Sequence, residues 1–409
     1  MLETPSVSPS LTTTAISAAA LAAFIHYTPL SSNAYKLQQT IKSLSAALSQ
    51  PSDDGKELVQ PATYRQISLN PLEWLRLYAP PLTLNAPALF REVREAWGID
   101  EELYKACFEP SAIRQGPNGK GGGGEFLFAG PPASHKDPER RRREGKMDDT
   151  HWILKSLTRE FETRFFFATF LPAYIPYAQS HPSSLLIRCS DTLYNFEVYL
   201  GHLGGLSSGN YMVMEDLISR ARALSEDVEE VRDWDLKPGG YMHPEKDTIG
   251  LGSDEEKEEE EEGIEDGTVW LKEEDWKWVK ETLERDTQFL ADLGIVDYSL
   301  LLTRSPLPPT YSPSSSEEKD NERGRPTLIS PDNKYIYHLA IIDYMISKHT
   351  WFPQLMENIA HPLNKKIQEW GRCEGKKWRY TMTEEPGAYR EEFLGMVSKA
   401  VRTDAKVEE

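Results

Sequence analysis

Cysteine is scarce in this chain. Its 409 residues include three cysteines, Cys107, Cys189 and Cys373, and these are far apart. An odd and widely spaced set offers neither a disulfide framework nor the spacing of a cysteine metal site. We therefore expect the protein to work in a reducing, intracellular compartment.

Long apolar runs are missing as well. No segment approaches the roughly 18–20 consecutive apolar residues that would span a bilayer. The nearest candidate, AISAAALAAFI at residues 15–25, has no basic stretch before it. The sequence therefore predicts neither a membrane-spanning helix nor a secretory signal.

Positive charge is in short supply. Lysine and arginine number 46 against 65 acidic residues, so the formal net charge is −19. This balance argues against broad nucleic-acid binding. The acids are unevenly spread, because residues 254–266 read DEEKEEEEEGIED. A run of this composition is typical of a solvated loop.

Aromatic residues are plentiful, with 10 Trp, 18 Tyr and 14 Phe, so most of the chain is expected to fold. Periodicity and turn signals predict strands at 126–128, 151–157, 184–200, 211–216 and 334–346, and helices at 88–108 (interrupted near Gly98, with Asp100 as a cap), 158–170, 218–230, 270–293 and 386–402. Residues 305–331 read as a loop rich in proline, serine and glutamate. This order indicates an α+β protein of two lobes. We expect a peripheral segment at 1–60, a first lobe at 61–217 and a second at 218–409.

Glycines cluster in QGPNGKGGGGEFLFAG, residues 115–130. Gly119, Gly121 and Gly122 would let backbone N–H groups approach a phosphate, although most glycine-rich loops are linkers. Lys155 follows in an apolar strand, where lysine is rarely buried without a partner. A strand lysine after a glycine-rich hairpin is how protein kinases hold ATP phosphates. An exposed lysine on an edge strand is the alternative.

Carboxylates stand at three further places. In WDLKPGG, residues 234–240, Asp235 and Lys237 are one residue apart, so an extended segment points both to the same side. They could share a phosphate and its metal ion, or form a surface salt pair. Asp297 in GIVDYSLLL and Asp343 in LAIIDYMI each follow an apolar run. Each could be a strand-end cap, although a buried lone carboxylate is costly.

The order of these features is that of kinase parts: glycine-rich loop, strand lysine, catalytic-loop aspartate, then an aspartate that ends an apolar strand. The H-R-D and D-F-G signatures of protein kinases are absent, which excludes an ordinary protein kinase.

The chain resembles the phosphatidylinositol phosphate kinase family, as a divergent member similar to the phosphatidylinositol-4-phosphate 5-kinases. LGIVDYSLLL is similar to the family's I-M-D-Y-S-L-L, FREVREAWGIDEELY to its L-R-E-x-x-G-I-D-E-x-x-Y, YMVMEDL to its V-V-M-x-N hinge, DLKPGG to its D-L-K-G-S, LAIIDYMI to its G-I-I-D-I-L and EEPGAYREEFLGMV to its closing P-x-x-Y-x-x-R-F. The similar segments run in the family's order over about residues 85–405.

The resemblance implies a kinase-like two-lobed fold, with an antiparallel sheet in the N-lobe and a mixed α/β C-lobe. It implies ATP and Mg²⁺ as cofactors, a phosphoinositide lipid as acceptor, and peripheral contact with the cytosolic face of a membrane. By position it assigns ATP binding to Gly119, Gly121, Gly122, Lys155 and Met214, Mg²⁺ binding to Asp343, and catalysis to Asp297, Asp235 and Lys237. The lipid's own phosphate would meet Lys237 and the basic stretch Lys365, Lys366, Arg372, Lys376, Lys377 and Arg379.

The chain departs from the family pattern in the region that would grip the lipid. Pro238-Gly239 stands in place of Gly-Ser, residues 350–353 read TWFP where paired lysines are expected, and Glu392 replaces an arginine. A second departure concerns the ATP lysine. The spacing to the helix glutamate that should form an ion pair with Lys155 differs from the family's, so that glutamate is Glu160 or Glu162.

Two alternatives therefore stay open. DLKPG also fits the D-x-K-x-G motif of soluble inositol polyphosphate kinases, and the acidic charge fits an inactive kinase-fold scaffold or lipid-binding protein. The D-Y-S-L-L block favours the lipid kinase. The phosphorylated hydroxyl and the oligomeric state are not predicted.

Overall fold

A computed structural model gives the fold of the chain. It describes residues 33–50, 55–59, 81–115, 126–131, 151–195, 209–225, 230–239, 268–308, 325–355, 357–358 and 380–403. The glycines of residues 116–124, the acidic run 254–266 and the basic stretch 365–379 lie outside these ranges.

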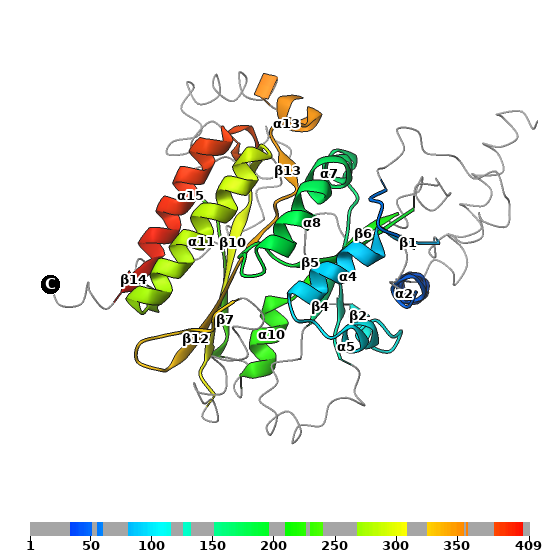
Figure 1. The fold of residues 1–409 in the computed structure, drawn as a ribbon, viewed down its shortest axis with the longest axis horizontal. Coiled ribbons are helices and arrows are strands. Elements are labelled where there is room, and N and C mark those ends of the chain that lie inside the picture. The colour runs from blue at the N-terminus through cyan, green and yellow to red at the C-terminus, as the bar shows by residue number, and fades with distance from the viewer. Residues whose placement is uncertain are drawn as a thin grey trace, which may run out of the picture.

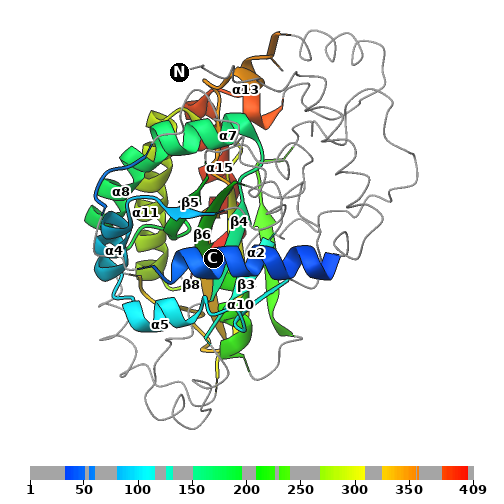
Figure 2. The same ribbon diagram turned by 90° about the vertical axis from the view of Figure 1, so that its right-hand side faces the viewer.

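The first lobe is built on an antiparallel sheet. Its described strands lie in the order β1 (Thr83–Leu84), β5 (Cys189–Tyr194), β6 (Asn210–Glu215), β4 (Trp152–Ser156), β3 (Phe126–Ala129) and β2 (Ile113–Gln115). Leu127, Leu154 and Val213 lie opposite one another on β3, β4 and β6 and are buried in one core. Helices α2 (Asn33–Leu48) and α5 (Glu101–Ala106) close this core, and Figure 2 shows α2 along one side of the lobe. The antiparallel N-lobe sheet is thus confirmed.

Local signals explain the helices of this lobe. Helix α4 (Pro87–Ala96) stops at Gly98, whose φ of 67° few other residues adopt. Asp100 then caps α5 by accepting hydrogen bonds from the backbone N–H groups of Glu102 and Leu103, as predicted. Helix α7 (Glu160–Phe165) passes through a π-helical turn, Phe166–Phe170, into α8 (Leu171–Ser180). The helix expected to end near residue 170 therefore continues to 180.

The second lobe combines an antiparallel sheet with helices. The sheet has the order β11 (Leu328–Ile329), β12 (Tyr335–Ile342), β10 (Ser299–Pro306), β7 (Arg232–Leu236). Helices α10 (Leu217–Leu224), α11 (Glu273–Asp292) and α15 (Pro386–Ala400) accompany it, and α11 and α15 lie side by side (Figure 1). A short parallel pair, β8 (Val269–Leu271) with β14 (Val401–Thr403), lies beside it. The combination of helices and strands is the mixed α/β C-lobe that was expected.

One expectation for this lobe was wrong at its edges. Residues 305–331 were expected to form one loop, yet Pro306 is the last residue of β10 and pairs with Tyr335. Leu328 and Ile329 form β11. The middle of the segment, 309–324, lies outside the described residues.

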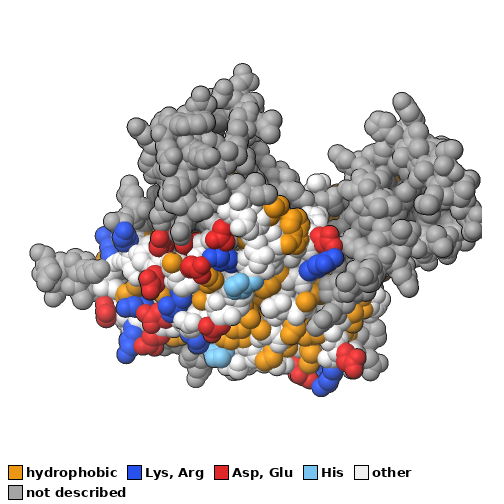
Figure 3. Space-filling view, turned by 90° about the horizontal axis from the view of Figure 1, so that it is seen from above, with side chains coloured by type: hydrophobic (Ala, Val, Ile, Leu, Met, Phe, Trp, Pro, Cys, Tyr) orange, Lys and Arg blue, Asp and Glu red, His pale blue; other side chains and the backbone are white. Residues whose placement is uncertain are grey.

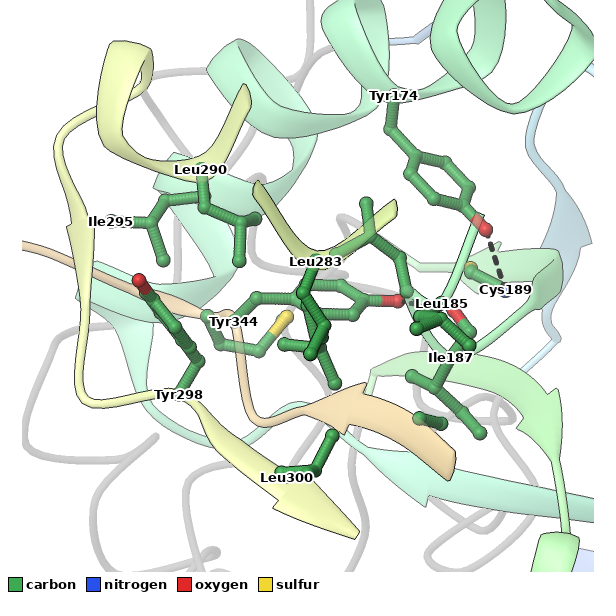
Figure 4. Packing of buried hydrophobic residues seen from close by; sticks show 14 of the residues in the cluster. Tyr174, Leu185, Ile187, Cys189, Leu283, Leu290, Ile295, Tyr298, Leu300 and Tyr344 are labelled. Carbon is green, nitrogen blue, oxygen red and sulfur yellow. Dashed lines mark hydrogen bonds between the residues drawn. The ribbon is translucent and has the colours of Figure 1, made fainter. Parts of the chain in front are cut away.

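The two lobes share one hydrophobic core. Figure 4 shows Tyr344 among Leu185, Ile187 and Leu283, residues from both lobes. The connecting segment 184–187 pairs with β12, since the Ile187 N–H donates to the Ile341 carbonyl and the Ile341 N–H to that of Leu185. No helix in the described ranges is both long enough and apolar enough to cross a membrane.

Candidate active site

Asp297 and Asp343 each lie where the polypeptide passes between two sheets. Asp297 lies between β9 (Ile295–Val296) and β10, and Asp343 lies between β12 and β13 (Ile346–Ser347). Strands β9 and β13 pair with each other, and so do β10 and β12, with Ser299 opposite Ile342. The two sets of pairs therefore bring both aspartates to the same end of the second-lobe sheet.

The backbone at both positions is left-handed. The φ angle is 65° at Asp297 and 60° at Asp343. Aspartate tolerates this region better than most residues, but the conformation still costs free energy and is typical of functional sites. Each aspartate precedes a fully buried tyrosine, Tyr298 or Tyr344. The Tyr344 hydroxyl donates to the Ile187 carbonyl over 2.8 Å, which anchors the turn beneath Asp343.

Lys155 reaches Asp343 from the other lobe. It lies on β4, and its Nζ is 2.7 Å from Asp343 Oδ1. Burial alone would raise the pKa of Asp343, but the positive charge of Lys155 outweighs it and lowers that pKa below its usual value. The Asp343 side chain keeps 41% of its surface exposed, so the charged carboxylate remains open to a ligand.

Lys237 and Asp297 form a second ion pair. Leu236 pairs with Leu300, which carries Lys237 to the Asp297 end of the sheet. Its Nζ is 3.3 Å from Asp297 Oδ1. Burial disfavours the ammonium form, yet the carboxylates of Asp297, Asp343 and Asp235 raise the pKa of Lys237. All three carboxylates therefore lie close enough to act on one lysine.

The remaining predicted residues divide into two groups. Met214 lies on β6 opposite Ile153, in the strand beside that of Lys155, and Asp235 is exposed on β7. The glycines Gly119, Gly121 and Gly122 and the cations Lys365, Lys366, Arg372, Lys376, Lys377 and Arg379 lie outside the described residues.

The expected glutamate partner of Lys155 was wrong. Glu160 pairs with Arg164 and Glu162 with Arg159, while Lys155 pairs with Asp343. Glu162 is still near the site. Its pKa is raised, mainly by burial and also by the charge of Asp343, while the charges of Arg159 and Lys155 oppose the shift.

Sequence reasoning did not find Thr381. This residue begins a short 3₁₀ helix, Thr381–Thr383, and its hydroxyl donates to Asp297 Oδ1 over 2.5 Å. No motif marks Thr381, because its partner is 84 residues earlier in the chain.

A magnesium ion would depend on few protein ligands here. The described residues contain no group of three or more His, Cys, Asp or Glu side chains that could hold a metal. Magnesium at kinase sites needs only one or two carboxylates, because phosphate oxygens and water complete its octahedron. The ionised and partly exposed Asp343 fits this role.

Comparison with known protein families now adds an independent finding. The model of the phosphatidylinositol-4-phosphate 5-kinase family matches residues 146–325. This match supports a place for the chain in the phosphatidylinositol phosphate kinase family. The matched range holds Lys155, Asp235, Lys237 and Asp297, and the α+β architecture is a kinase-like fold of this family.

Asp343 lies beyond the segment that the family model matches, yet its ion pair with Lys155 places it inside the same site. No curated protein matches the chain.

Proposed function

We propose that this kinase transfers the γ-phosphoryl group of ATP to an inositol-ring hydroxyl of a phosphatidylinositol monophosphate. One observation carries the proposal: the ion pairs Lys155–Asp343 and Lys237–Asp297 meet at one end of one sheet. Phosphoryl transfer depends on positioning the reactants and on neutralising their charge. Two lysines and two aspartates at one place can serve both purposes.

Each side chain has a task in this scheme. Lys155 would bind ATP phosphates, and Asp343 would hold Mg²⁺ together with those phosphates. Bound ATP supplies the phosphoryl group, and Mg²⁺ neutralises its charge. Lys237 would stabilise the transferring group between the attacking and leaving oxygens. Asp297 would orient the ring hydroxyl and accept its proton as the new P–O bond forms and the bond to ADP breaks.

The proposed acceptor would bring the protein to a membrane surface. We propose peripheral contact with the cytosolic face, since phosphoinositides are reached there and an acidic protein needs a local basic face to approach them. Figure 3, a view from above the molecule in Figure 1, shows acidic and basic side chains interspersed rather than separated. The basic stretch 365–379 is our candidate for that face.

A phosphoinositide panel tests the reaction. The full chain is incubated with labelled ATP, Mg²⁺ and vesicles that carry each phosphatidylinositol monophosphate, in parallel with soluble inositol phosphates. We expect label on lipid, abolished by Lys155→Met and by Asp343→Asn. Lys280→Met is the matched control, because Lys280 is an exposed lysine on α11. It should retain full activity.

The same experiment separates the alternatives. Label on soluble inositol phosphates alone would make the protein a soluble inositol phosphate kinase, for which DLKPG at 235–239 is the supporting motif.

Calorimetry with Mg·ATP addresses the scaffold alternative. We expect binding by the wild type that Asp343→Asn abolishes, and a wild type that binds no nucleotide would refute an active kinase.

A further inference from the structure

The described residues place two hydrogen-bond donors on the same oxygen of Asp297. The Thr381 hydroxyl is 2.5 Å from Oδ1, and the Lys237 ammonium is 3.3 Å from that same atom. Within the described part of the chain, no residue donates a hydrogen bond to Oδ2. Two donors that converge on one oxygen fix the rotation of a carboxylate and direct its other oxygen elsewhere.

The donors come from separate parts of the chain. Lys237 extends from the strand that pairs with β10, whereas Thr381 belongs to a 3₁₀ helix far along the chain. The next element, α15, holds the following residue, since the Tyr389 hydroxyl donates to the Tyr298 carbonyl and Tyr389 packs edge-on against Tyr298. Contacts from outside β9 and β10 therefore support the left-handed turn at Asp297.

We propose that Thr381 is a positioning residue that turns Oδ2 of Asp297 toward the acceptor hydroxyl. The inference deepens the proposed phosphoryl transfer and rests on it. Lys237 cannot fix the carboxylate alone, because its ammonium also faces Asp343, Asp235 and the phosphate it would bind. The neutral hydroxyl of Thr381 holds Oδ1 without adding a charge that would compete for the phosphoryl group.

The test replaces the hydroxyl while keeping the side-chain shape. Thr381→Val should lower kcat by about tenfold to a hundredfold, the range expected for a misplaced reacting group. It should leave the KM for ATP unchanged, because Lys155 and Asp343 are untouched. Thr381→Ser restores the hydroxyl and should recover most of the rate.

Thr383→Val is the matched control. Thr383 is buried in the same 3₁₀ helix, but its hydroxyl donates to the Tyr380 carbonyl and not to Asp297. It should lose stability to a similar degree and keep kcat. An equal loss of kcat in Thr381→Val and Thr383→Val, or no rescue by serine, would overturn the proposal.

A double-mutant cycle keeps the inference independent of the acceptor. Urea unfolding is measured for Thr381→Val, for Asp297→Gly, which tolerates the left-handed backbone, and for the double variant. We expect the double variant to lose less stability than the sum of the single losses, since both remove one hydrogen bond. Additive losses would overturn the pairing. If the cycle shows coupling but the wild-type protein phosphorylates nothing, the proposed function is refuted, while the pairing of Thr381 with Asp297 stands.

Discussion

Asp286 offers the sharpest test of how the lobes are joined. It is fully buried on α11, and its two oxygens divide their partners. Oδ2 accepts from the Leu185 N–H over 2.5 Å and from the Ser184 hydroxyl over 3.0 Å. Oδ1 accepts from the Tyr177 hydroxyl and from Arg285. A single carboxylate therefore ties a second-lobe helix to the first-lobe segment that pairs with β12.

Asp286→Asn keeps the shape and removes half of the acceptors. Whichever way the amide turns, its NH₂ group faces one partner that can only donate, the Leu185 N–H or the Arg285 guanidinium, whereas the Ser184 and Tyr177 hydroxyls can turn and accept. At least one charge-assisted hydrogen bond is therefore lost, and such a bond contributes about 1.5–3 kcal/mol. We expect the free energy of unfolding to fall by about 1.5–3 kcal/mol.

Urea unfolding followed by circular dichroism measures this loss. Asp292→Asn is the control, because Asp292 is an exposed residue of the same helix that accepts from Gln288. It should change stability by less than about 0.5 kcal/mol. A loss in Asp286→Asn below about 1 kcal/mol, or no larger than that of the control, would contradict the reasoning that this carboxylate joins the lobes.

Two further predictions concern pH and backbone geometry. Burial, with a smaller contribution from the charge of Arg220, lowers the pKa of His338 to about 3. The unfolded chain binds this proton near pH 6.5 and the folded chain does not, so stability is lost as the pH falls below 6.5, by about 1.4 kcal/mol at pH 5.5. Urea unfolding at pH 7.5 and 5.5 should show a smaller difference in His338→Asn, and an equal difference would contradict this. Gly294 has a φ of 70°, and an added Cβ would collide with His349. Thermal unfolding of Gly294→Ala should show a loss of about 2–3 kcal/mol, whereas Gly395→Ala, with nothing within 4 Å, should be neutral or slightly stabilising.

The sequence predicted elements whose signals are local. Val279, Leu283 and Leu290 repeat at helical spacing and Gly294 ends the run, so α11 was found almost to its bounds. The stretch FFATFLPAYIP in residues 166–176 is apolar on every side and holds two prolines, so it shows no period. Its continuation through a π-helical turn into α8 depends on burial against both lobes.

In the candidate site, too, some features are marked by local sequence and others depend on the fold. Lys155, Asp297 and Asp343 stand out because each is a charge in an apolar strand context. Which charges meet is decided by the fold. Arg159 and Arg164 take the two glutamates that helix position alone assigns to Lys155. The Thr381 contact depends on how the C-terminal elements return to β9, and no spacing encodes that return.

The left-handed backbone at Asp297 and Asp343 also limits which substitutions the fold tolerates at these two positions. Glycine, asparagine and aspartate enter that conformation at low cost, and other residues add about 1–2 kcal/mol of strain. A descendant that abandoned the chemistry but kept the fold would therefore be expected to carry asparagine or glycine at these two positions. Drift toward most other residues would erode the scaffold together with the reaction.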